Sequence, residues 1–126
     1  MNARSFAMMT LNASVALALL AAAAAATAQS APPLQQYVIE RDIKGAGAMT
    51  PVQLRDAAQK SNTVLRALGP DIQWVHSYVA GDKIYCVYNA PSEALIRSHA
   101  EKSGFPADRI TPVSAVIDPT TANPRR

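Results

Sequence analysis

Residues 72–90 read IQWVHSYVAGDKIYCVYNA, two runs rich in β-branched and aromatic residues that meet at Gly81-Asp82. Two such runs around a glycine are typical of a β-hairpin, and glycine at the first central position favours a type II′ turn. Counting outward from the turn pairs Val79 with Ile84, Ser77 with Cys86 and Val75 with Tyr88 on one side of the sheet. The opposite side then carries Trp74, His76, Tyr78, Tyr85, Val87 and Asn89.

The segments on either side of the hairpin predict the rest of the fold. A strand is expected over residues 37–43, and Thr50-Pro51-Val52-Gln53 has the N-cap, proline and capping-box glutamine of a helix start. That helix ends at Gly69-Pro70. A second helix is expected over residues 92–103, followed by a strand over residues 109–117. The order β-α-β-β-α-β predicts an α+β, ferredoxin-like sandwich with two helices on one face of a four-stranded antiparallel sheet.

The sheet face without helices is called the open face below. It is expected to carry Trp74, Tyr78, Tyr85 and Val87. This is more apolar and aromatic surface than a small monomer usually leaves in water. The sequence therefore predicts a homodimer formed through the open faces of two copies.

The N-terminal segment has the order of a secretory signal peptide. A cationic start at Arg4 precedes an uncharged apolar stretch over residues 13–26, and Ala26-Thr27-Ala28 is an A-x-A cleavage site. The alternative is a retained membrane anchor, but the strongly apolar part, residues 15–20, is far shorter than the roughly 20 residues that a spanning helix needs. We expect a signal peptide over residues 1–28, and after its removal no stable membrane anchor and a periplasmic or secreted protein.

The remaining chain suits one small domain. The predicted parts are a flexible tether over residues 29–36, the domain over residues 37–117 and a mobile tail over residues 118–126. The formal net charge of +3 includes Arg4, Arg125 and Arg126, so the domain itself is nearly neutral. It has no basic stripe with interleaved aromatic residues, which argues against nucleic-acid binding. No G-x-S-x-G motif or glycine-rich phosphate loop is present, so a non-enzymatic role is favoured.

Residues that could bind a metal ion gather on the predicted open face. Alternation along the first strand directs Glu40 and Asp42 to the same face as His76, about 10 Å away across one intervening strand. A carboxylate and an imidazole suit nickel, copper or zinc. The alternative is a hydrogen-bonded Glu/His pair at a dimer interface. The single cysteine, Cys86, falls on the side opposite His76, and His99 is expected at the surface of the second helix or at the edge of the core.

Five motifs in order resemble a known family. They are YVIERDI at 37–43, IQWVHSYV at 72–79, DKIYCVY at 82–88, APSE at 90–93 and GFPADRI at 104–110. Together they resemble the family called domain of unknown function 4242, also described as nickel-binding or nickel-responsive-regulator-like. The similarity covers about residues 36–122. It implies a ferredoxin-like sandwich, commonly dimeric, and a nickel-binding capacity attributed to some members.

The motifs and the resemblance favour a metal site built on His76 and Glu40. The secondary candidates are Tyr78, Tyr85, Cys86 and His99. The leading hypothesis is an exported small module that binds nickel or another divalent transition metal for buffering or sensing. Two alternatives remain open: an enzyme of the dimeric α/β-barrel type, with a small-molecule cavity lined by His76, Tyr78 and Tyr85, or an interaction module without a ligand.

Overall fold

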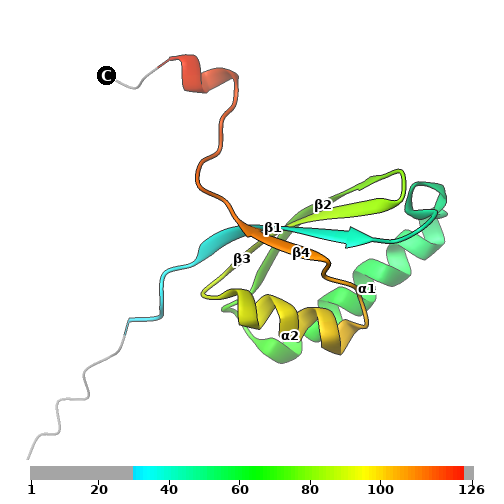
Figure 1. The fold of residues 1–126 in the computed structure, drawn as a ribbon. Helices are drawn as coiled ribbons and strands as arrows, with labels where there is room; N and C mark the ends of the chain where they lie inside the picture. The colour runs from blue at the N-terminus through cyan, green and yellow to red at the C-terminus, as the bar shows by residue number, and fades with distance from the viewer. Residues whose placement is uncertain (1–29, 124–126) are drawn as a thin grey trace, which may run out of the picture. The chain divides into compact units, whose positions relative to one another are not determined.

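The computed structural model describes residues 30–123 and has the predicted order of elements (Figure 1). The predicted signal peptide, residues 1–28, lies outside the described residues, as do residues 124–126 of the predicted tail. The strands are β1 (Gln35–Asp42), β2 (Gln73–Ala80), β3 (Lys83–Ala90) and β4 (Arg109–Pro112). The helices are α1 (Pro51–Leu68) and α2 (Glu93–Ser103), with two short 3-10 helices at Ala46–Ala48 and Pro119–Ala122.

The sheet is antiparallel with the order β2-β3-β1-β4, and α1 and α2 lie against the same face (Figure 1). This confirms the α+β, ferredoxin-like sandwich. The capping box at the start of α1 is also present: the Thr50 hydroxyl accepts a hydrogen bond from the Gln53 amide, and the Gln53 side chain accepts one from the Thr50 amide. At the end of α2, Gly104 adopts a left-handed conformation with φ of 70°, as a C-terminal cap requires.

The hairpin follows the predicted register near its turn and departs from it further out. Gly81 has a positive φ of 59°, and Val79 pairs with Ile84. A β-bulge between Trp74 and His76 then adds one residue to β2, so that Trp74, not Val75, pairs with Tyr88. The prediction for this pair is wrong, because an added residue reverses the alternation of side chains beyond the bulge.

The bulge moves the indole ring of Trp74 from the predicted open face to the helix-covered face. There the ring stacks on Tyr88 with 6.5 Å between centroids and 15° between planes. Its Nε1–H donates a hydrogen bond of 2.9 Å to the Ser77 hydroxyl. Val75 is left exposed on the strand. The bulge therefore gives the only tryptophan of the chain a partly buried position with a partner for its polar atom.

The last strand is shorter than expected. β4 pairs with β1 from Arg109 to Pro112, and the Val113 amide adds one hydrogen bond to the carbonyl of Gln36. Regular pairing ends near this point because β1 itself begins at Gln35. Further along, the Asp118 carboxylate caps the 3-10 helix in the tail, and hydrogen bonds from Thr120 lower the pKa of that carboxyl. The mobility of the tail stays a prediction.

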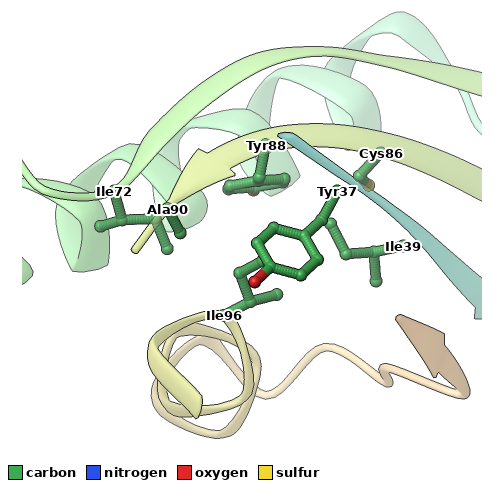
Figure 2. Packing of buried hydrophobic residues seen from close by; sticks show 7 residues of the cluster. All are labelled: Tyr37, Ile39, Ile72, Cys86, Tyr88, Ala90 and Ile96. Carbon is green, nitrogen blue, oxygen red and sulfur yellow. The ribbon is translucent and has the colours of Figure 1, made fainter. Parts of the chain in front are cut away.

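The core lies between the sheet and the helices. Figure 2 shows the Tyr37, Ile39 and Ile96 side chains converging between β1 and α2, with Tyr88 and Cys86 on β3 beside them. Ile39, Ala90 and Ile96 are completely buried. Among the described residues, neither α1 nor α2 has the length and apolar character to cross a membrane.

Candidate functional site

The open face carries two rows of side chains that run across three strands. Each row is fixed by the register of β3 with its two neighbours. One row contains His76, Val87 and Val38, and the next contains Tyr78, Tyr85 and Glu40. The predicted open-face positions of Glu40, His76, Tyr78, Tyr85 and Val87 therefore agree with the observed register, and only Trp74 leaves the set.

His76 presents its imidazole ring to solvent at the β2 edge of the sheet. The ring packs edge-on against Tyr78, with 4.8 Å between centroids and 72° between planes. Tyr78 is itself 62% exposed. An exposed imidazole beside a phenol ring is free to coordinate a metal ion through its accessible nitrogen.

Glu40 is surrounded by cations. Its carboxylate lies 3.2 Å from Lys83 Nζ and 3.5 Å from Arg109 Nε, and Lys83 also lies 3.2 Å from Asp42. Hydrogen bonds to Glu40, and then to Asp42, raise the pKa of Lys83. These pairs are partly or largely exposed, so each stabilises the fold only weakly. A metal ion that binds Glu40 would have to displace Lys83.

The structure does not bring His76 and Glu40 together within one chain. They are separated by β3 and stand in neighbouring rows, so the spacing of strands and residues puts their Cα atoms about 12 Å apart. Within residues 30–123, no three His, Cys, Asp or Glu side chains cluster closely enough to hold a metal ion. The imidazole and carboxylate donors have the chemistry that nickel favours, but one copy offers them as separate donors.

Cys86 points away from the open face, as expected. It is buried, and its Sγ accepts a hydrogen bond of 3.2 Å from Arg41 Nε. A ligand role shared with His76 would require the thiol to pass through the sheet.

His99 occupies a different environment from the one predicted. It is fully buried, whereas the sequence suggested a position at the helix surface or the core edge. Its Nε2 lies 3.1 Å from the Ser61 hydroxyl, which in turn lies 3.2 Å from the Tyr88 hydroxyl. Burial lowers the pKa of His99, and the charge of Arg41 lowers it further. The reason is helical spacing, because His99 shares the buried stripe of α2 with Ile96, Ala100 and Ser103.

A pocket lies on the helix-covered side of the sheet, against α1. The enzymatic alternative requires a cavity lined by His76, Tyr78 and Tyr85, but these residues lie on the open face, because they alternate with the inward residues of β2 and β3. The lining of the pocket includes Arg41, which no chemical motif in the sequence marks. Alternation was the available signal, since Arg41 must share a side with Ile39.

The protein has a ferredoxin-like fold, with both helices on one face of an antiparallel four-stranded sheet. The other face is exposed and carries the donor side chains. Comparison with known proteins then identifies its family. The model of the family described as "Nickel responsive protein SCO4226-like" matches residues 37–113, and the chain belongs to this family. Among curated proteins, none matches the chain significantly.

A solved structure has the same fold. It is the crystal structure of SCO4226 from Streptomyces coelicolor A3(2), which aligns with a TM-score of 0.55 and 24% sequence identity over 65% of this chain and 99% of that one. The nickel-responsive part of the sequence resemblance is thereby confirmed at the level of the family. The name domain of unknown function 4242 stays a prediction.

Proposed function

We propose that this protein is an exported small metal-binding module that binds nickel, or another divalent transition metal, for buffering or sensing. The observation that carries the proposal is the exposed imidazole of His76 on the face that also bears the Glu40 carboxylate. Membership of a family described as nickel responsive supports nickel as the first metal to test. The signal-peptide pattern over residues 1–28 supports export to the periplasm or the exterior.

We further propose that two copies associate through their open faces. Tyr78 and Val75 are exposed apolar side chains at the β2 edge of the sheet, and a facing copy would bury the first of them. A two-fold arrangement also brings the donors of both copies to one interface. His76 and Glu40 would hold the ion, and Tyr78 and Tyr85 would limit its access to water. Cys86 and His99, buried on the other side of the sheet, are not part of this proposed site.

Isothermal titration with nickel tests the metal site. The protein is purified without a histidine tag, since a tag would bind nickel itself. We expect His76→Ala to weaken nickel binding at least tenfold. Gln73→Ala, an exposed substitution on the same strand, is the matched control and should leave the affinity unchanged. Equal affinities for His76→Ala and the control would refute a site built on His76.

Two measurements separate the remaining parts of the proposal. Sedimentation velocity at micromolar concentration should give a dimer, and Tyr78→Arg, which introduces a charge into the proposed interface, should give a monomer. A wild-type monomer would rule out the open-face dimer without deciding the metal site. N-terminal sequencing of the protein from the envelope fraction should begin at Gln29, and an intact Met1 would argue against cleavage.

A further inference from the structure

The pocket against α1 is independent of the proposed metal site and has the features of a binding site of its own. It has a cavity volume of about 90 Å³ and is partly open to solvent. Its walls are mostly apolar and include Leu54 and Ala58 from α1 and Trp74, Val79 and Ile84 from the hairpin. Polar groups enter it from Arg41, Ser61, Ser77 and Tyr88.

Arg41 gives the pocket a buried positive charge. The residue is only 3% exposed, and its Nη1 donates a hydrogen bond of 2.6 Å to the carbonyl of Pro106. Its Nε donates to the Cys86 sulfur, and the guanidinium lies 5.6 Å from the centre of the Phe105 ring. The remaining nitrogen, Nη2, is buried and has no hydrogen-bond partner within residues 30–123. A buried guanidinium usually has an anion beside it, because the uncompensated charge is costly.

The described residues provide no such anion. None of the ion pairs found in residues 30–123 involves Arg41. The Phe105 ring beside Arg41 also contacts a second cation, Lys60 of α1, whose Nζ lies 5.5 Å from the centre of the ring. His99, whose pKa is lowered by burial and by Arg41, contributes no negative charge. The positive charges of Arg41 and Lys60 therefore favour an anionic ligand on this side of the sheet.

We propose that this pocket binds a small organic monocarboxylate, with its carboxylate beside the Arg41 guanidinium and its hydrocarbon part against Leu54 and Trp74. Guanidinium and carboxylate groups form strong, charge-assisted hydrogen bonds. The apolar walls select an organic acid over inorganic phosphate or sulfate, which would leave polar oxygens unpaired. A cavity of about 150 Å³ accommodates benzene. This pocket of about 90 Å³ is smaller but partly open to solvent, so an acid of about four or five carbons would leave part of its surface in solvent. The binding is reversible and involves no chemical step.

Trp74 provides a direct readout, because it lines the pocket and is the only tryptophan in the chain. The purified chain is titrated with isovalerate at constant ionic strength while tryptophan fluorescence is followed. We expect saturable binding with a Kd on the order of 1 mM, as suits a ligand of few atoms. Two ligands of similar shape serve as controls: 3-methylbutanol, which is neutral, and 3-methylbutylamine, which is cationic. Each should bind at least tenfold more weakly.

Two variants test the roles of charge and space. Arg41→Met keeps an unbranched side chain but removes the charge and should weaken isovalerate binding at least tenfold, whereas Arg66→Met on the exposed side of α1 should not. If Arg41→Met fails to fold, Ala58→Leu retains the guanidinium and fills the pocket, and it should also abolish binding. Absence of saturable binding by the wild type overturns the proposal. Equal binding of the acid and the alcohol does so too. Neither result bears on nickel binding at His76.

Discussion

Acidification is expected to destabilise the fold through His99. In the folded protein this side chain is completely buried, Nδ1 has no hydrogen-bond partner within residues 30–123, and burial together with Arg41 lowers its pKa. In the unfolded chain the imidazole titrates near its ordinary pKa of about 6.5. Below that pH the unfolded state binds a proton that the folded state excludes, so the free energy of unfolding decreases as the pH falls.

The size of the effect follows from proton linkage. Stability that depends on neutral His99 is fully present above about pH 6.5 and is lost as the pH falls toward the lowered pKa of the folded state. For one proton the slope cannot exceed about 1.4 kcal/mol per pH unit. If His99 remains neutral in the folded protein, the free energy of unfolding therefore falls by at most about 1.4 kcal/mol between pH 7.5 and 5.5.

Urea unfolding followed by Trp74 fluorescence at pH 7.5 and 5.5 measures this loss. The chain has two histidines, so each can be removed in turn. His99→Gln should abolish the pH-dependent part, even if it lowers stability at both pH values. His76→Gln, at an exposed position, should retain it and is the matched control. The same pH-dependent loss in His99→Gln and the wild type would show that the loss comes from other groups, and the reasoning would be wrong.

Two further substitutions test how the core and the helix start are stabilised. Ser61→Ala removes the partner of the Tyr88 hydroxyl and of His99 Nε2, and it should lower the free energy of unfolding, measured by chemical denaturation, by about 1–3 kcal/mol. Asn62→Ala, at the exposed neighbouring position, should change it by less than about 0.5 kcal/mol. Equal effects of the two substitutions would contradict a structural role for Ser61. Thr50→Ala removes the N-cap of α1 and should cost about 1 kcal/mol in the same assay; an unchanged stability would mean that the capping box does not contribute.

Local signals in the sequence predicted most of the fold. The capping box at Thr50, the glycine cap at Gly104 and the turn at Gly81 each depend on neighbouring residues alone, and all three occur in the structure. The bulge at Val75 could not be read in the same way. The segment from Trp74 to His76 contains no glycine or proline to mark an extra residue. What favours the bulge is the contact between the Trp74 and Tyr88 rings on the helix-covered face, and this contact depends on the pairing of β2 with β3.

The candidate site was predictable only as far as alternation reaches. Alternation assigned Glu40, His76, Tyr78 and Tyr85 to one face, in agreement with the observed register. It could not show that Lys83 and Arg109 approach Glu40, because those contacts depend on the pairing of β1 with both its neighbours. The error at His99 has another origin. Its helical spacing from Ile96 and Ser103 indicates the buried side, and the Ser61 hydroxyl provides a hydrogen-bond partner for Nε2 there.

The alternation of side chains along β3 places the proposed metal site and the proposed pocket on opposite faces of the sheet. Tyr85 and Val87 face the open side, whereas Cys86 and Tyr88 face the helices. A shift of one residue would exchange the two sets and put the phenol of Tyr88 in the open face. The Gly81 turn at one end of the hairpin and the Trp74–Tyr88 stack at the other oppose such a shift. Substituting Trp74 should therefore disturb the proposed pocket directly. It should change the position of His76 on the open face only if the register of the hairpin is lost.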